Sequence, residues 1–255
     1  MIINRVLGKV VHRAAKEFFD TNLSGLSVGM RRGANFIVLN ADCRKPFSND
    51  SLLDTSRAED LSFLFMISES NMSPMLDLTA CKKISRMFYQ NFHGNFLVIR
   101  FSGDPELKDC YEAFAYCSSL HTIEGNFHFA KNAYISNMFE GCKSLKALPA
   151  LNVSDVDTRY WGGKDFSSSM TKIDTSRIRL RDGTEVESWC CKVDIDFGKS
   201  HLPHDDVMYL ISHLIEEGDA NKKHLKLSAW SLGLLTDEEK AIATNKGWSL
   251  VENAE

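Results

Sequence analysis

Three stretches of the chain repeat one pattern of apolar and polar positions. Each stretch is eight residues long, and together they cover residues 84–91, 110–117 and 135–142. They begin 26 and then 25 residues apart, and another apolar residue follows 13 positions after each start, at Leu97, Ile123 and Leu148. A constant period in the twenties is typical of a solenoid, in which each unit buries its apolar face only against its neighbours.

The pattern within each stretch predicts a short helix followed by a strand. In the second unit, Cys110, Phe114 and Cys117 have the i, i+4, i+7 spacing of one helix face, and we interpret the cysteines as small buried apolar side chains. Residues 123–129 then alternate apolar and polar, which predicts a strand with one buried face. The predicted fold class is therefore α/β, built of helix-turn-strand units. Weaker outer units are expected around Phe63 or Phe65 and around Phe166.

The chain is divided here into three segments: an N-terminal docking or capping segment (1–60), the repeats (61–200) and a C-terminal cap (201–255). Residues 1–20 are amphipathic and contain Phe18 and Phe19, which predicts either a docking arm or a helix packed on the body. Residues 191–197 alternate strictly and predict the last strand of the repeats.

The last 55 residues are predicted to close the end of the repeats. An apolar stripe after Pro203 predicts a helix that continues to Ile215, and residues 225–227 predict a short strand. Thr236 and Glu239 have the spacing of a capping box, and Lys246-Gly247 predicts the end of that helix before a strand over 248–251.

The repeat motif resembles a known family. Phe114-x-x-Cys117-x-x-Leu120-x-x-Ile123 and Met138-Phe139-x-x-Cys142-x-x-Leu145-x-x-Leu148 resemble units of the BspA-like leucine-rich-repeat family. Residues 201–250 look like the terminal module of such proteins in gut bacteria and their phages. The resemblance covers about residues 80–255 and implies a leucine-rich-repeat fold and a binding role. It implies neither catalytic residues nor a cofactor, and the family ranges from surface adhesins to phage tail-associated proteins.

Composition and charge narrow the choice of partner. The chain has 255 residues, 44% of them hydrophobic, with a net charge of −4, so no general affinity for nucleic acid or anionic membranes is indicated. No stretch approaches 18 apolar residues, which predicts no membrane span. Residues 1–50 contain eight Lys and Arg against four Asp and Glu, a net +4, whereas residues 201–255 contain five against ten, a net −5. This asymmetry could steer head-to-tail contacts in a homo-oligomer, or belong to two ordinary solvated faces.

The expected location follows from the N-terminus and the cysteines. Residues 1–13 are interrupted by charges and do not form a secretory signal, and seven cysteines, an odd number, suggest reduced thiols. We therefore expect a phage virion component, tail-associated or decorating and assembled in the bacterial cytoplasm. It would bind other proteins of the particle or of the host surface. A bacterial cell-surface adhesion protein of the same fold is the alternative.

The predicted strands suggest a contact surface. If Leu97, Ile99, Phe101 and their counterparts face inward, the opposite sheet face presents a row of polar side chains. The residues proposed for binding on this face are Arg100, Glu124, Asn126, His128, Asp194 and Asp196. A sheet face that is merely solvated is the competing interpretation.

Two patterns could indicate an enzyme. Gly25-Leu26-Ser27-Val28-Gly29 fits a nucleophile elbow, but Ser27 precedes a predicted strand rather than a helix. His201 and His204 with Asp205 have a metal-compatible spacing, yet four convergent zinc ligands are not evident. A hydrolase is therefore the remote alternative, and the sequence predicts no catalytic and no metal-binding residues.

Overall fold

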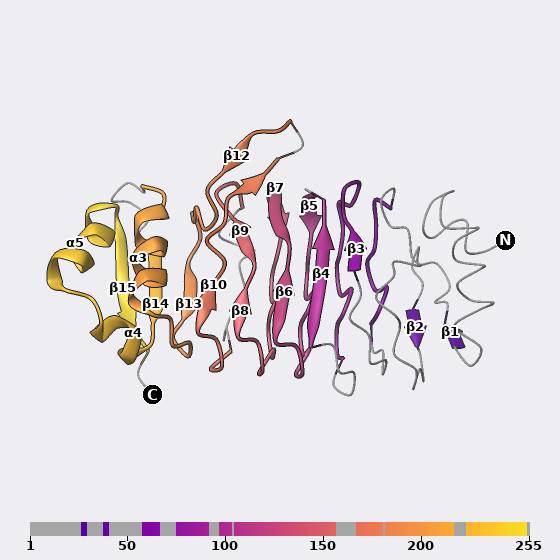
Figure 1. Ribbon diagram of the computed structural model, residues 1–255, viewed down its shortest axis with the longest axis horizontal. Coiled ribbons are helices and arrows are strands. Elements are labelled where there is room, and N and C mark those ends of the chain that lie inside the picture. Colours follow the sequence, from indigo (N-terminus) through magenta and orange to yellow (C-terminus); the bar gives the residue numbers. More distant parts are fainter. Residues whose placement is uncertain are drawn as a thin grey trace.

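The computed structural model describes residues 58–66, 75–91, 97–103, 105–156, 167–180, 182–216 and 223–253, together with the backbone of residues 27–29 and 38–40. Within these residues the fold is mixed α/β, with parallel sheets and few helices. The units follow one another along the long axis of the molecule, and the helices gather at the C-terminal end (Figure 1). Adjacent parallel strands come from successive units, so sequence order becomes order in space.

Two parallel sheets run through the repeats, and most units contribute one strand to each. The strands of the five-stranded sheet are β3 (Met75–Asp77), β4 (Val98–Ser102), β6 (Thr122–Glu124), β8 (Ala147–Leu148) and β10 (Lys172–Ile173). Those of the three-stranded sheet are β5 (Glu106–Asp109), β7 (Asn126–Tyr134) and β9 (Ala150–Asn152). The predicted strand over residues 123–129 is therefore two strands in two different sheets.

A glycine makes the corner between these two strands. Gly125 separates β6 from β7 with a φ of 134°, and Gly103 follows β4 with a φ of 86°. A Cβ atom on Gly125 would lie 2.8 Å from the Cβ of Phe101 in the preceding unit. Both the backbone angle and the close approach exclude a larger side chain, so the chain can change direction here only at glycine.

The predicted helices of the repeats are wrong. Residues 85–90, 111–116 and 136–141 form successive turns in place of a helix. Glu112 and Tyr116, four residues apart, have φ values of 51° and 62°, and Arg86 with Gln90 and Asn137 with Gly141 repeat this pairing. The segments pair with one another: Phe114 N–H donates to the carbonyl of Met138, one unit further on, whereas Ala113 N–H donates to Cys110 within the segment. In an α-helix, most of these backbone N–H groups would donate to carbonyls of the same helix, so they could not bind the next unit.

The predicted inward positions are nevertheless buried. Cys110, Ala113, Phe114 and Cys117 are each at most 1% exposed, because the turns bring the same positions to one face. A column of stacked rings fills this face, with centroid separations of 5.1, 5.7 and 5.6 Å along Phe65, Phe88, Phe114 and Phe139. Phe65 thus belongs to an earlier unit, as predicted. Leu97, which we expected to face inward, is 48% exposed.

The eighth residues of the three repeats, together with three serines further along the chain, form a second column, which we call the donor ladder. Each of its side chains donates a hydrogen bond to a backbone carbonyl of the preceding unit. Its members are Asn91, Cys117, Cys142, Ser167, Ser200 and Ser228, and their donor-to-acceptor distances are 2.9, 3.0, 3.0, 2.8, 3.2 and 2.7 Å. The cysteines are buried as expected, but they also act as polar donors.

The C-terminal part keeps this ladder but changes its secondary structure. A third parallel sheet consists of β13 (Ile195–Phe197), β14 (Lys223–Leu227) and β15 (Trp248–Glu252). The helices are α3 (His204–His213), α4 (Ala229–Gly233) and α5 (Asp237–Asn245). A hairpin of β11 (Ile178–Arg179) and β12 (Glu185–Val186) precedes them. The capping box of Thr236 and Glu239 and the strand at Trp248 are confirmed. The helix predicted after Pro203 is also present, but it ends at His213 and not at Ile215, and the strand predicted over 191–197 is confined to β13.

Helix α3 lies against the last strand of the five-stranded sheet. The Asp206 carboxylate accepts a hydrogen bond of 3.0 Å from the backbone N–H of Ile173 in β10. Burial raises the pKa of Asp206, which the bond from Ile173 partly offsets. The first turn of α3 therefore satisfies an N–H at the edge of the sheet.

Near the N-terminus, β1 (Ser27–Gly29) and β2 (Val38–Asn40) pair antiparallel. The predicted docking residues Phe18 and Phe19, and the outer repeat at Phe166, lie outside the described residues. Among the described residues, no helix is long and apolar enough to cross a membrane.

Candidate binding surfaces

The turn segments present a cluster of tyrosines around one ion pair. Arg86 and Glu112 are the third residues of neighbouring segments, so stacking brings them together, and Arg86 Nε lies 2.7 Å from Glu112 Oε2. The Glu112 side chain is only 10% exposed, and the left-handed backbone of both residues fixes their direction. Burial opposes the charge of Arg86, but the hydrogen bond and charge of Glu112 outweigh it and raise the pKa of Arg86. The pair is thus a fixed element of the surface.

Aromatic rings frame this pair. The guanidinium carbon of Arg86 lies 5.2 Å from the ring centroid of Tyr89 and 5.1 Å from that of Tyr111, within cation–π range. Tyr111 also stacks on Tyr134 at 5.0 Å, and Tyr89 meets the edge of Tyr116 at 5.8 Å. We call this set the tyrosine surface; its members are Arg86, Tyr89, Tyr111, Glu112, Tyr116, Tyr134 and Glu140.

Neighbouring carboxylates keep the phenols protonated. The Tyr116 hydroxyl donates a 2.8 Å hydrogen bond to Glu140, and this bond raises the pKa of Tyr116. The pKa of Tyr111 is raised first by its hydrogen bond to Glu112. At neutral pH the tyrosine surface therefore presents aromatic rings whose hydroxyl groups donate to neighbouring carboxylates and are held in place by them. Fixed tyrosine rings beside charged groups are typical of protein contact sites.

The residues predicted for binding on the strands lie on three different sheets. Arg100 and Glu124 are opposite one another on β4 and β6, and Arg100 Nε lies 2.7 Å from Glu124 Oε2. Both side chains are well exposed, so this pair contributes about 0.2–1 kcal/mol at most. Asp194 and Asp196 belong to the C-terminal sheet region. The single continuous patch that the sequence predicted is thus not formed.

Asn126 and His128 lie on β7, in the three-stranded sheet. His128 is in register with Glu106 on β5 and with Asn152 on β9, so the three residues form one row across that sheet. The Nδ1 atom of His128 is buried and has no hydrogen-bond partner in the described part of the chain.

Asp194 and Asp196 bind backbone and side-chain groups of the next strand. Asp194 accepts from the backbone N–H of His224 at 2.8 Å, and Asp196 lies 3.0 Å from Lys226 Nζ. These carboxylates connect β13 to β14, which accounts for them without a ligand.

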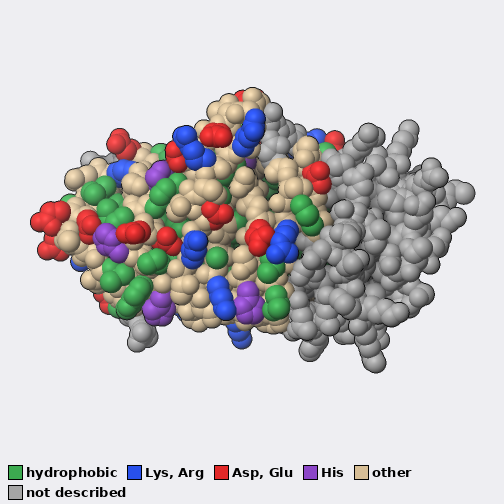
Figure 2. Space-filling view, viewed as in Figure 1, with side chains coloured by type: hydrophobic (Ala, Val, Ile, Leu, Met, Phe, Trp, Pro, Cys, Tyr) green, Lys and Arg blue, Asp and Glu red, His purple; other side chains and the backbone are tan. Residues whose placement is uncertain are grey.

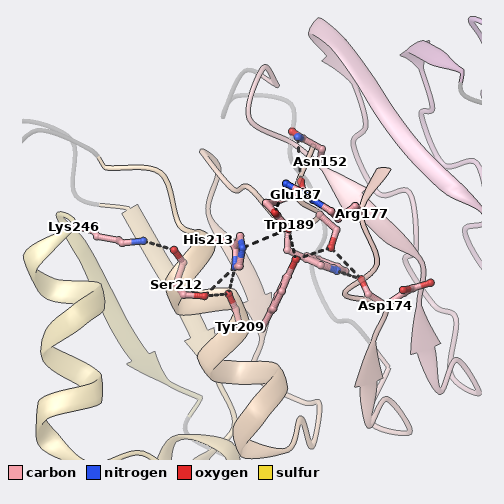
Figure 3. A network of polar contacts seen from close by, with 10 residues as sticks. Asn152, Asp174, Arg177, Glu187, Trp189, Tyr209, Ser212, His213 and Lys246 are labelled. Carbon is pink, nitrogen blue, oxygen red and sulfur yellow. Dashed lines mark hydrogen bonds and ion pairs between the residues drawn. The ribbon is translucent and has the colours of Figure 1, made fainter. Parts of the chain in front are cut away.

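Figure 3 shows a polar network where the repeats meet α3. Glu187 lies 2.7 Å from Arg177 and accepts from the Tyr209 hydroxyl at 3.3 Å. The ring of His213 stacks on Tyr209 at 4.0 Å, and His213 Nε2 is 3.9 Å from Glu187. On the other side of the helix end, Lys246 donates to the carbonyl of Ser212. The network thus joins the hairpin segment, α3 and the end of α5.

This network contains serine, histidine and glutamate, but not in a catalytic arrangement. The carbonyl of Tyr209 can only accept, and His213 Nδ1 lies 2.8 Å from it, so Nδ1 carries the proton. The same nitrogen is 2.9 Å from Ser212 Oγ and therefore cannot take the serine proton. Ser212 itself donates to Tyr209. A general base acting on a serine would need a free lone pair at this point.

Comparison with protein-family models, with curated proteins and with solved structures finds no match to this chain. The function is therefore inferred from the geometry of these surfaces together with the sequence motifs.

The residues that the sequence suggested for catalysis or metal binding do not form a site in the structure. Ser27 begins β1, a strand paired antiparallel with β2, whereas a nucleophile elbow places the serine between a strand and a helix. His201 packs on Trp230 at 5.7 Å, while His204 bonds to Asp205 and Glu239. No group of three or more His, Cys, Asp or Glu residues in the described part of the chain could hold a metal ion.

The described thiols are free and mostly buried. Burial raises the pKa of Cys142 to about 12, and it raises the pKa of Cys117 well above its ordinary value. Such thiols stay protonated, as the donor ladder requires, and are poor nucleophiles.

Sequence reasoning missed the tyrosine surface, although a signal was present. Tyr89 and Tyr116 are the sixth and seventh residues of their repeats, positions that the apolar pattern leaves on the outside. Reading the outward positions of the repeat as one column would have found them.

Proposed function

We propose that this chain is a non-catalytic leucine-rich-repeat binding protein and a structural component of a phage particle, with the tyrosine surface as its contact site. The observation that carries the proposal is the fixed Arg86–Glu112 pair framed by Tyr89 and Tyr111 across successive units. Partly exposed tyrosines that are already held in place lose little conformational entropy on binding, which favours a protein partner. The period of the repeats and the donor ladder support a leucine-rich-repeat solenoid, and the sequence resemblance supports the phage setting.

The first experiment determines whether the chain is a component of phage particles. Particles purified on a density gradient should contain the full chain in constant proportion to the major particle proteins, measured by quantitative mass spectrometry. Recovery of the chain only in the cell-surface fraction would favour the adhesion alternative and contradict a particle component.

The surface test uses matched variants at Tyr89 and Tyr116. The double substitution Tyr89→Ser and Tyr116→Ser should abolish incorporation into particles, because truncating a central aromatic anchor costs about 2 kcal/mol or more. Tyr89→Phe and Tyr116→Phe keep the rings and should retain most of the incorporation. Equal incorporation of both pairs, with unchanged melting temperatures, would show that the contact lies elsewhere.

A further inference from the structure

The C-terminal end of the stack exposes an unusual combination of apolar and acidic side chains. Trp230, Leu234 and Ile242 are 50%, 38% and 39% exposed, and they are three of the six large apolar side chains exposed in the described part of the chain. Terminal repeats normally turn a polar face to water, so exposed aromatic and aliphatic groups at this end indicate a contact.

The exposed face of α5 combines both properties. Its exposed residues are Asp237, Glu238, Ala241, Ile242, Thr244 and Asn245. Glu238 and Ile242 lie one turn apart on the same face. The Asp237 side chain is 98% exposed, and its ion pair with Lys240 is long, at 3.8 Å. Figure 2 shows acidic side chains gathered over this end of the molecule, with apolar groups beside them.

Lysines neutralise the acidic charge of this end only in part. Lys246 is committed to the backbone carbonyls of Ser212 and Leu214, at the far end of α5 from the acidic residues. Across residues 201–255, ten Asp and Glu stand against five Lys and Arg, a net −5. The surface therefore suits a partner that is both basic and apolar.

We propose that this end docks the N-terminal segment of a second copy of the chain. Residues 1–20 contain Arg5, Lys9, Arg13 and Lys16 among apolar residues that include Phe18 and Phe19. The first described unit, residues 58–66, pairs with residues 83–87 at the end of the stack opposite to α5. The two surfaces thus differ, and the contact is head-to-tail, which builds rings or open chains. This proposal stands independently of the tyrosine surface.

Sedimentation velocity of the full chain tests the proposal. Association should increase with protein concentration and weaken with salt, because charge steers the contact. The reversal Arg5→Glu, Lys9→Glu and Arg13→Glu, and separately the reversal Asp237→Lys and Glu238→Lys, should each raise the dissociation constant by about tenfold or more. For the second reversal, the matched control Glu106→Lys with Glu185→Lys makes the same change of charge at exposed sites elsewhere and should have no effect.

Mixing the two reversed variants is the decisive step. Each variant retains one original surface, so the basic segment of one copy can still bind the acidic end of the other, and association should return. Trp230→Ser with Ile242→Ser should abolish association in the full chain, with circular dichroism confirming that the variants fold. A chain that stays monomeric at every concentration, or a mixture that does not recover, would overturn the proposal.

Discussion

The repeats at residues 84–156 and the units at residues 191–253 share one donor ladder, but the backbone segment before each ladder residue has a different conformation in the two regions. In the repeats, the segment before each ladder residue is a run of turns, and left-handed residues such as Glu112 and Tyr116 let it pair with the next unit. In the C-terminal units the segment before Ser200 or Ser228 is a regular strand, β13 or β14. Non-glycine residues in the left-handed region carry strain, so the turn segments depend more on packing than the C-terminal units do.

The difference also separates two kinds of surface. Stacking of the turn segments brings Tyr89 and Tyr111 against Arg86, and Tyr116 against Tyr89. The C-terminal strands instead pair their polar side chains with one another, as Asp196 does with Lys226. The strained turn segments thus contain the surface that we propose for binding. In the regular C-terminal strands, the polar side chains pair with one another instead.

The largest expected effect is the loss of a ring from the phenylalanine column. Phe114 stacks between Phe88 and Phe139 and meets the edges of Phe101 and Phe127. Phe114→Ala should lower the free energy of unfolding by about 3–5 kcal/mol through lost transfer energy and the remaining cavity. Chemical denaturation measures this value, and a change below about 1 kcal/mol would mean that packing does not maintain the turn segments.

The donor ladder is tested by two substitutions at Cys142. If its thiol acts as a donor to Phe114, Cys142→Ser should stay within about 1 kcal/mol of the original free energy of unfolding, since the hydroxyl donates in the same place. Cys142→Val leaves the carbonyl without this donor and should cost about 1–3 kcal/mol. The opposite ranking in denaturation experiments would restore the interpretation of this cysteine as a simple apolar residue.

The C-terminal units depend on local capping. Thr236 accepts from the N–H of Glu239, and the Glu239 side chain accepts from the N–H of Thr236. Thr236→Ala should cost about 1 kcal/mol, and hydrogen exchange should rise in α5 without rising in the turn segments. Faster exchange throughout the repeats would show that the two regions unfold as one unit.

A smaller effect is expected from His204, which connects α3 to α5. Hydrogen bonds to Asp205 and Glu239 raise the pKa of His204 above its ordinary value of 6.5. These hydrogen bonds therefore stabilise the folded chain fully below the pKa that His204 has in the unfolded chain. This stabilisation is lost as the pH rises through the pKa of His204 in the folded chain. Glu239 remains ionised over this range, because the Thr236 N–H and His204 lower its pKa. Melting curves from pH 5 to 8 should show this loss in the original chain and not in His204→Gln; identical profiles would contradict it.

Much of this architecture could be read from the sequence, and the exceptions have physical causes. The period, the buried positions, α3, the capping box and β14 follow from local patterns. The helices predicted in the repeats fail because an i, i+4, i+7 pattern describes which side chains face inward, and successive turns satisfy it as well as a helix does. Only hydrogen bonds between units, such as Phe114 to Met138, distinguish the two, and these depend on residues far apart in sequence.

The binding residues were harder to predict. Glu124 and His128 are equivalent as alternating positions in the sequence, but Gly125 turns the chain between them and sends β6 and β7 into separate sheets. The row of Glu106, His128 and Asn152 depends on strand register across three units. Register between distant strands is not encoded in any local pattern.

The tyrosine surface as the contact site is tested most directly by comparing hydrogen exchange of the chain bound in the particle with that of the free chain. The tyrosine surface, if it is the contact, should show slowed exchange at residues 85–90 and 111–116 in the bound state, whereas residues 195–197 and 223–227 in the C-terminal sheet should remain unchanged. Unchanged exchange in both turn segments, with protection confined to the C-terminal sheet, would contradict the proposed contact site.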